Sequence, residues 1–421
     1  MLQAAAKKGK NSLELFVDDL TARQSEPSES GSPRAVSAGK VELARLFLKL
    51  GFTAFGGPAA HIAMMESEVV RRRSWLSREE FLDLLGAVNL IPGPSSTEMA
   101  IFIGYRQAGK LGLLLAGCCF ILPAAVIVMA IAWAYQRYGK LPQAEALFYG
   151  IKPVIIAIVA QALWRLGRSA VKNRTLAVIG LGAVLASGFG INPLSVLFGS
   201  GALMMIGQAI RTRPKGVTAC FAPILGAAGI LPAATTGEAV AATAFSNGAL
   251  FLFFLKVGAV LFGSGYVLLA FLRADLVEHR HWLTENQLLD AVAVGQFTPG
   301  PVFTTATFIG YILGGPVSAV VATIGIFLPS FVFVALSGPL VPRLRRSPTA
   351  GAFLDGVNVA SLALMAVVTW QLGGNAIMDT FTLLLAMGAA FVLIRFRINS
   401  AWLVLGGAVL GVVARLIHSH G

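Results

Sequence analysis

Charged side chains are scarce in this sequence. Of its 421 residues only 13% are Asp, Glu, Lys or Arg, whereas 56% are hydrophobic, and the mean hydropathy is +0.76. A soluble globular protein carries about a quarter charged residues because its surface faces water. The composition therefore excludes a soluble protein and predicts an all-α polytopic membrane protein.

Cysteines and the signatures of common catalytic sites are also scarce. Cys118, Cys119 and Cys220 lie in apolar surroundings without metal-ligand spacing, which excludes a disulfide framework and gives no support to a metal or redox centre. No Walker loop, dinucleotide-binding fingerprint or nucleophile–base constellation is present. We therefore expect neither an enzyme nor a cofactor. The net charge of +13 lies in short segments between apolar runs, where it sets membrane orientation, so we expect no nucleic-acid partner.

Long apolar segments follow one another from Val41 onward. Residues 1–40 are polar and broken by proline, so we expect a disordered cytoplasmic tail rather than a signal peptide. The remainder predicts about thirteen membrane spans. These lie near 41–63, 81–105, 111–135, 147–166, 175–191, 193–210, 217–233, 247–272, 287–311, 315–337, 353–372, 377–394 and 398–416.

The spans form a six-span unit that occurs twice. Pro92-Gly93-Pro94 recurs 207 residues later as Pro299-Gly300-Pro301, and Gly150 recurs 206 residues later as Gly356. One residue is lost and later regained, so the whole unit is repeated. The predicted domains are a first repeat at 41–210, a linker with one extra span at 211–246, and a second repeat at 247–416.

The extra span inverts the second repeat. Four basic residues follow the fourth span of the first copy, between Arg165 and Arg174, whereas the matching stretch Gln371–Thr380 has none. Cytoplasmic loops carry an excess of Lys and Arg, so opposite charge bias indicates an inverted repeat. We expect a cytoplasmic N-terminus and an outside C-terminus. Arg71-Arg72-Arg73 disagrees, because the span count places it outside.

The two Pro-Gly-Pro triplets are expected to break helices at membrane depth. Proline removes backbone donors and glycine permits positive φ. A helix that starts there presents unpaired N–H groups, hydroxyls and a positive dipole end, which suit an anion. The alternative is a pair of proline kinks satisfied by neighbouring helices. We favour a substrate site, formed by Pro92, Gly93, Pro94, Ser95, Ser96, Thr97, Pro299, Gly300, Pro301, Thr304 and Thr305.

A second matched pair lies near the end of the first span of each copy. Gly56 and Gly57 of the first copy correspond to Gly263 and Ser264 of the second. These small residues either allow close helix packing or form another unwound turn that lines the cavity. Packing is slightly favoured, and all four stay among the candidate substrate-binding residues.

Some charged residues fall within or beside the apolar spans. Glu98, just past the first triplet, is a candidate proton or cation coupling site, although the second copy has no acid near Thr305 and Ala306. The alternative is a carboxylate paired with a cation near the interface. Four further residues could orient the broken helices or take part in coupling, but lysines near span ends often only snorkel. They are Asp83, Asp290, Lys49 and Lys256.

The segment Glu66–Glu80 is charged and amphipathic. The favoured interpretation is an interfacial helix with intrahelical pairs such as Glu68–Arg72. The alternative is a basic vestibule, formed by Arg71, Arg72 and Arg73, that concentrates anions at the outer mouth.

These motifs together resemble the chromate ion transporter family in its long, two-domain form. The resemblance lies in Phe55-Gly56-Gly57-Pro58 with His61, the run Glu68 to Trp75-Leu76, Pro92-Gly93-Pro94, and their second-copy equivalents. It implies a secondary transporter of the inner membrane that exports chromate and confers chromate resistance, with sulfate as analogue or competitor. The second copy departs from the pattern at Ser264-Gly265 and in lacking the acid.

Three other functions stay open at this point. They are a proton-coupled importer of sulfate or another inorganic anion, a channel, and a membrane chromate reductase. The expected partners are chromate and the lipid bilayer, and a homodimer is considered.

Overall fold

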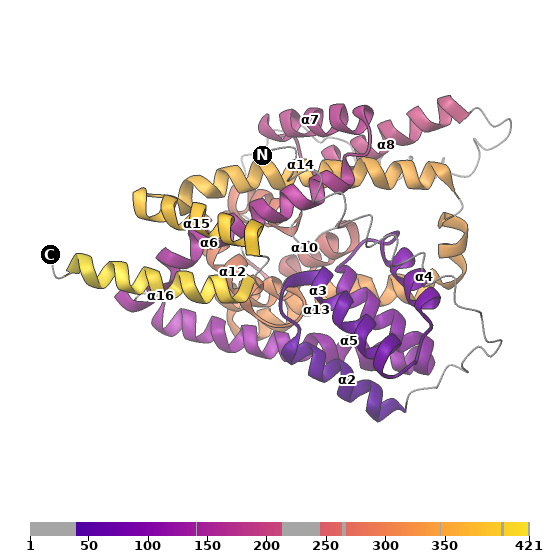
Figure 1. Cartoon of the computed structure of the whole chain (residues 1–421), viewed down its shortest axis with the longest axis horizontal. Helices are drawn as coiled ribbons and strands as arrows, with labels where there is room; N and C mark the ends of the chain where they lie inside the picture. Colours follow the sequence, from indigo (N-terminus) through magenta and orange to yellow (C-terminus); the bar gives the residue numbers. More distant parts are fainter. Residues whose placement is uncertain are drawn as a thin grey trace, which may run out of the picture. The chain divides into compact units, whose positions relative to one another are not determined.

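The computed structural model describes residues 39–139, 141–212, 245–262, 267–345, 347–396 and 400–419 (Figure 1). All regular secondary structure within these residues is helical. The predicted tail at 1–38, the predicted span 217–233 and two candidate site residues, Gly263 and Ser264, lie outside the described residues.

The described part of the chain begins with a helical hairpin. Helix α2 (Lys40–Thr53) ends before Gly56, and α3 (Gly57–Glu66) continues into the π-helical turn η1 (Ser67–Arg72). Gly56 and Gly57 have φ of 102° and 80°, which reverses the chain at this point. Two ion pairs join the arms in antiparallel order, since Arg73 lies 3.3 Å from Glu42 and Lys49 lies 3.5 Å from Glu68. The predicted span 41–63 therefore turns back on itself.

A second hairpin contains the first Pro-Gly-Pro triplet at its tip. Helix α4 (Arg78–Val88) starts with a capping box between Ser77 and Glu80, and α5 (Ser95–Tyr138) starts directly after Pro94. Arg106 lies 3.5 Å from Glu80, so the first arm of α5 returns to the start of α4. The helix break predicted at this triplet is present, but the predicted span 81–105 also reverses.

Helix α5 then reverses once more at Ala108 and Gly109. Gly109 has a φ of +60° at this reversal. The two arms of α5 pack so closely that a Cβ added to Gly104 would lie 2.6 Å from the Cβ of Ala116. Residues 40, 73–77 and 108–109 consequently lie at the same end of this half. Only the second arm of α5 runs on as a long continuous helix.

The second half repeats this order of elements. Lys256 lies 3.2 Å from Asp275, which matches the pair Lys49–Glu68, and the chain reverses at Gly314 and Gly315 within α13. The elements are α10 (Asn247–Val260), α11 (Leu268–Leu272), η3 (Arg273–His279), α12 (Glu285–Phe297), η4 (Val302–Thr304) and α13 (Thr305–Arg345).

The remaining helices pack reciprocally between the halves. Helix α6 (Pro142–Ala170) packs against α15 (Thr380–Phe396) and α16 (Ser400–Ser419) of the second half (Figure 1). Helix α14 (Pro348–Ala376) packs against α7 (Arg174–Gly188) and α8 (Pro193–Thr212) of the first half. Small residues allow this approach, since a Cβ on Gly150 would lie 2.8 Å from the Cα of Gly411, and one on Gly356 would lie 2.9 Å from the Cα of Gly201.

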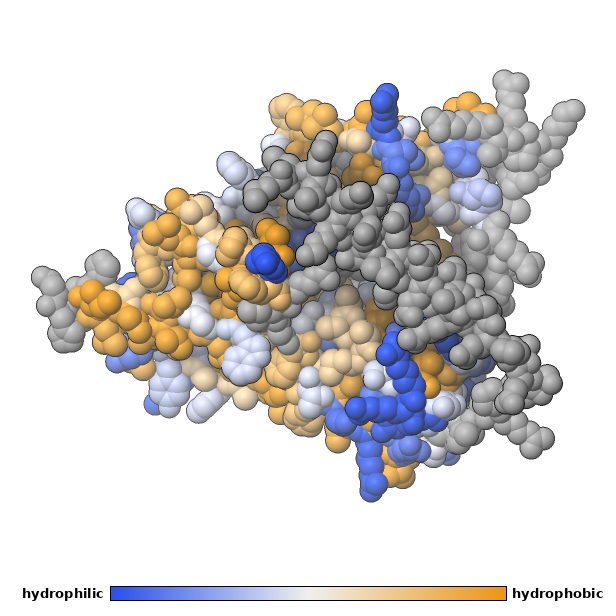
Figure 2. All heavy atoms as spheres, in the orientation of Figure 1, coloured by the Kyte–Doolittle hydropathy of each residue, from blue (hydrophilic) through white to orange (hydrophobic). Residues whose placement is uncertain are grey.

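Six helices in the described part of the chain are long and apolar enough to cross a membrane, fewer than the thirteen predicted spans. The difference arises largely because hydropathy registers apolar length and not chain reversal. Large apolar side chains point outward, including Trp402, which is 71% exposed, and Phe391, which is 63% exposed. Figure 2 shows apolar residues over much of the visible surface of α15 and α16. Such a surface suits lipid and not water.

Candidate functional site

The two Pro-Gly-Pro breaks each bind the other half of the chain. The Gly93 N–H donates a hydrogen bond of 2.8 Å to the Leu261 carbonyl, and the Gly300 N–H donates one of 2.8 Å to the Ala54 carbonyl. All four residues obey the 207-residue repeat, so the two bonds are equivalent. The hairpin tips of both halves therefore meet at one locus, which we call the tip junction and define by these two bonds.

The first break leaves several polar groups unused. The N–H groups of Thr97 and Glu98 donate to the Pro94 carbonyl. The N–H groups of Ser95 and Ser96, in contrast, donate no hydrogen bond within the described residues. The Thr97 hydroxyl is fully buried and likewise has no partner there. Unpaired buried donors of this kind are costly unless a ligand or water satisfies them.

The second break is different because its hydroxyls are occupied. The Thr304 hydroxyl donates to the Pro301 carbonyl and the Thr305 hydroxyl donates to the Val302 carbonyl, each at 2.8 Å. The predicted site residues at Pro299 to Thr305 are thus at the tip junction, but these two side chains already donate their hydrogens to the backbone. The two breaks share a backbone arrangement and differ in available donors.

Glu98 lies beside Gly93 and a serine from the other half. Its side chain is fully buried, and a Cβ placed on Gly93 would lie 3.0 Å from the Glu98 carboxyl carbon and 2.7 Å from the Ser330 hydroxyl of α13. The Ser330 hydroxyl interacts with the Glu98 carboxylate, but no hydrogen bond of ordinary geometry reaches either Glu98 oxygen among the described residues. No cation pairs with it there, in contrast to the interfacial pair considered from the sequence.

Three buried polar residues near the tips were missing from the predicted site. Ser330 and Gln296 have unpartnered polar atoms, as do both ring nitrogens of His61. Gln296 and Thr305 line a pocket of about 10 Å³, room for roughly one water molecule. Their positions next to prolines could have pointed to two of these residues in the sequence, since Gln296 lies three residues before Pro299 and Ser330 directly follows Pro329.

Asp290 joins the two halves through a buried ion pair. Lys152 of α6 lies 3.1 Å from one of its carboxylate oxygens, and the Tyr135 hydroxyl of α5 donates to the other at 2.8 Å. The Lys152 ammonium also donates to Asn286 at 3.2 Å. The repeat partner Asp83 is exposed, so the two matched acids have different surroundings.

The arginine triplet belongs to a cluster of ion pairs around Glu68. Arg72 lies 3.0 Å from the Glu68 carboxylate, Arg73 contacts it directly, and Lys49 lies 3.5 Å away. Arg71 lies 3.6 Å from Glu66. The intrahelical pair Glu68–Arg72 is therefore present as predicted.

Stability should fall at acid pH because of this cluster. Burial raises the pKa of Glu68, but the hydrogen bond and charge of Arg73, with the charges of Lys49 and Arg72, outweigh it and hold the pKa below its usual 4.5. The stabilisation is present above pH 4.5 and is lost as the pH falls through the lowered pKa. We expect the melting temperature of purified protein to drop from pH 7 to pH 3.5, and to drop less in Glu68→Gln. An equal drop in both proteins would contradict this assignment.

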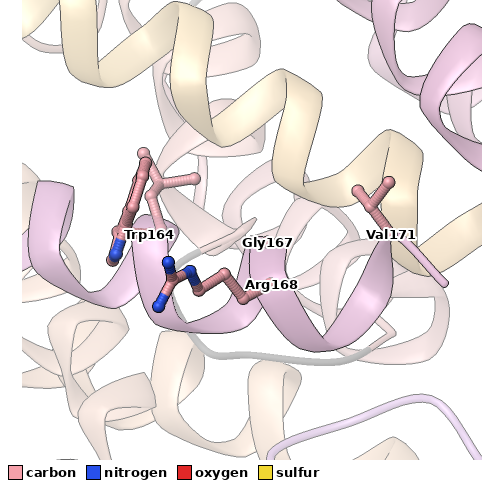
Figure 3. A pocket seen from close by; sticks show the side chains of 5 residues that line it. Trp164, Gly167, Arg168 and Val171 are labelled. Atoms are coloured by element: carbon pink, nitrogen blue, oxygen red, sulfur yellow. The ribbon is translucent and has the colours of Figure 1, made fainter. Parts of the chain in front are cut away.

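An open pocket on α6 is separate from the tip junction. It measures about 470 Å³ and is lined by residues of the last turns of α6 and by Val171 just beyond the helix; Arg168 stacks there over the Trp164 ring at 5.0 Å (Figure 3). None of the predicted site residues lines it. Among the described residues no group of three His, Cys, Asp or Glu side chains could hold a metal ion.

Comparisons with known proteins agree with the duplicated architecture. The family model described as Chromate transporter matches residues 41–205 and again residues 248–412. This chain belongs to the chromate transporter family. It is a multi-pass membrane protein, and the curated chromate transport proteins that match it are transport proteins and not enzymes. No solved structure matches it.

Several chromate transporter relatives match nearly the whole chain. A chromate transport protein of Cupriavidus metallidurans is 32% identical, over 90% of this chain and 94% of its own length. A probable chromate transport protein of Synechococcus elongatus is 32% identical, over 82% and 88%. A chromate transport protein of Pseudomonas aeruginosa is 34% identical, over 77% and 79%.

Proposed function

We propose that this protein is a secondary transporter that exports chromate across the plasma membrane by alternating access of two inverted halves. The observation that carries the proposal is the reciprocal pair of bonds at the tip junction, Gly93 to Leu261 and Gly300 to Ala54. In transporters with inverted repeats, substrate sites lie near the bilayer midplane where broken helices of the two halves meet. The domains follow the repeat, at 41–210 and 247–416, with the linker 211–246 between them.

In this arrangement the four hairpins are re-entrant and do not cross the bilayer. A cytoplasmic N-terminus then places 73–77 and 108–109 on the cytoplasmic side, so Arg71-Arg72-Arg73 obeys the positive-inside rule that it contradicted before. The second arm of α5, followed by α6, α7 and α8, crosses the bilayer. We propose that the second half is inverted relative to the first, which leaves the C-terminus outside; the extra span predicted at 217–233 lies outside the described residues. The arginine triplet, as an anion vestibule, would face the cytoplasm, from which the substrate comes.

The free donors of the first break suit a tetrahedral oxyanion. We propose that the N–H groups of Ser95 and Ser96 and the hydroxyls of Ser96 and Thr97 bind chromate at the start of α5, where the helix dipole favours negative charge. Sulfate has the same shape and charge, so we expect it to compete. Gly56 and Gly57 shape the tip of the first hairpin, and Lys49, Lys256, Asp83 and Asp290 orient the hairpin arms; Gly263 and Ser264 stay candidate substrate-binding residues from the repeat alone.

The membrane potential can drive export without ATP. One charge moving through 100 mV is worth about 2.3 kcal/mol, so a dianion that leaves a negative interior gains about twice that. Import of sulfate along the same path would be uphill without accompanying protons or cations.

Everted membrane vesicles provide the direct test. We expect chromate to accumulate in them under an inside-positive potential, with sulfate as an inhibitor, and not in vesicles from cells that lack the protein. Absence of chromate movement, together with proton-driven sulfate uptake into right-side-out vesicles, would identify an importer instead. Flux that neither saturates nor shows counterflow would identify a channel.

A further inference from the structure

Glu98 differs from the other buried acids in the described part of the chain because no cation pairs with it. Three acidic residues are buried in the described part of the chain, namely Glu68, Glu98 and Asp290. Glu68 pairs with arginines of its own hairpin, and Asp290 pairs with Lys152. Within these residues Glu98 alone has no ion pair; the Ser330 hydroxyl lies beside its carboxylate, without a hydrogen bond of ordinary geometry.

The elements packed against α5 supply no compensating charge. They are α2, α3, α4, α12, α13 and the turn η4, and η4 holds no ionisable residue. Lys49 of α2 is engaged with Glu68, and the His61 ring of α3 contacts the Phe120 ring at 5.8 Å between centroids. The described side chains of α13 include no charged group, and Ser330 is its polar residue beside Glu98. No described ion pair or hydrogen bond joins Glu98 to the other ionisable groups on these five helices, which are Lys40, Glu42, Arg45, Glu66, Arg78, Glu79, Glu80, Asp83, Glu285, Asp290 and Tyr311.

An anion bound beside Glu98 requires the carboxyl group to be neutral. An ionised carboxylate would repel the anion, whereas a protonated one donates a hydrogen bond to an anion oxygen. The Thr97 hydroxyl belongs to the residue before Glu98, and the Ser330 hydroxyl lies beside Glu98 in space. Both are buried without a hydrogen-bond partner of ordinary geometry, so they can donate further hydrogen bonds to the anion. The second half has Thr305 in place of this acid, and its hydroxyl donates to Val302. The two halves therefore offer one proton site between them.

We propose that Glu98 carries one proton together with each transported oxyanion, so that a dianionic substrate crosses with a net charge of −1. This inference rests on the proposed function. The proton binds a carboxyl oxygen of Glu98 on the cytoplasmic side and is released with the anion on the other side, and no bond of the substrate changes. Proton and anion favour each other's binding, so they move in the same direction and do not exchange.

The charge carried per substrate tests this directly. In proteoliposomes with a tenfold chromate gradient and equal pH, the potential that stops net chromate flux should be about 59 mV for one net charge and about 30 mV for two. We expect about 59 mV for the native protein, and a further shift of about 59 mV when a tenfold proton gradient is added. Glu98→Gln should give about 30 mV and no proton-dependent shift. Glu145→Gln, which alters an exposed acid of α6, should behave as the native protein.

Each outcome decides the inference. A native value of about 30 mV without proton dependence overturns it and leaves chromate transport intact. If Glu98→Gln does not transport, the native value still decides, and Glu98→Asp, which retains a carboxyl group, should keep the proton dependence. No chromate flux through the native protein overturns the proposed function, and the inference falls with it.

Discussion

Replacement of Gly93 by alanine should abolish chromate transport while leaving the protein in the membrane. Gly93 has a φ of +142°, which side-chain-bearing residues rarely adopt, and an added Cβ would lie 2.7 Å from the Ser330 hydroxyl. Strain of this kind costs about 1–3 kcal/mol, which alone reduces the population of the native arrangement by about 5- to 150-fold. Crowding of Glu98 and Ser330 adds to this loss. Gly300→Ala, at a φ of +86° and 2.6 Å from the Ala124 Cβ, should have the same effect.

Gly109→Ala is the matched control. Gly109 also has a positive φ of +60°, but an added Cβ there meets nothing within 4 Å. The Gly109→Ala variant should lower stability by about 1 kcal/mol, because it introduces backbone strain of the same kind as Gly93→Ala. It should retain transport, because it leaves the tip junction unchanged. Uptake into everted vesicles, normalised to the amount of protein in the membrane, measures both. Wild-type transport in Gly93→Ala and Gly300→Ala would show that the tip junction is not the substrate site.

Loss of Lys152 should be the most destabilising single charge removal among the described ion pairs. Lys152→Met leaves Asp290 buried without its cation, and breaking a buried pair by removing one partner costs about 3–5 kcal/mol. The double variant Lys152→Met with Asp290→Leu should recover most of this loss, since neither charge then remains buried. Thermal unfolding of the purified variants provides the measurement.

An exposed ion pair between the halves provides the comparison. Lys172 lies 2.8 Å from Asp355, and their side chains are 60% and 33% exposed. Lys172→Met should therefore cost no more than about 1 kcal/mol. Equal losses in the Lys152 and Lys172 variants would show that burial of the Asp290 pair contributes nothing.

The sequence predicted the helix breaks and not the path of the chain around them. Pro92-Gly93-Pro94 and its copy predict a helix break from the local sequence alone, because proline and glycine restrict or free the backbone at their own positions. The reversals at Gly56 and Gly109 depend on contacts between distant residues, such as Glu42 with Arg73, which hydropathy does not register. The thirteen-span assignment therefore counted hairpins as crossings.

The candidate site was predicted only in part, for a similar reason. The triplets identify the backbone locus, whereas the use of the Gly93 and Gly300 N–H groups depends on carbonyls at Leu261 and Ala54 in the opposite half. Ser330 lies beside Glu98 although 232 positions separate them in the chain. A repeat-based comparison could have suggested the contact, since each tip has an equivalent, but the two halves differ in which tip carries the acid.

Helix α6 packs against α15 and α16, and α14 packs against α7 and α8, so each half packs against helices of the other. This exchange has a consequence for the origin of the architecture. The small-residue faces of α6 and α14 are buried by helices of the opposite half, so in the proposed arrangement a half-length ancestor would bury them by pairing with a second molecule inserted the opposite way up. Such a protein would have had to populate both topologies. In the proposed inverted arrangement, fusion of two genes fixes the opposed orientations in a single chain and frees each half to diverge. The acid carried by one half alone is the kind of asymmetry that an ancestral pair of identical subunits could not have had.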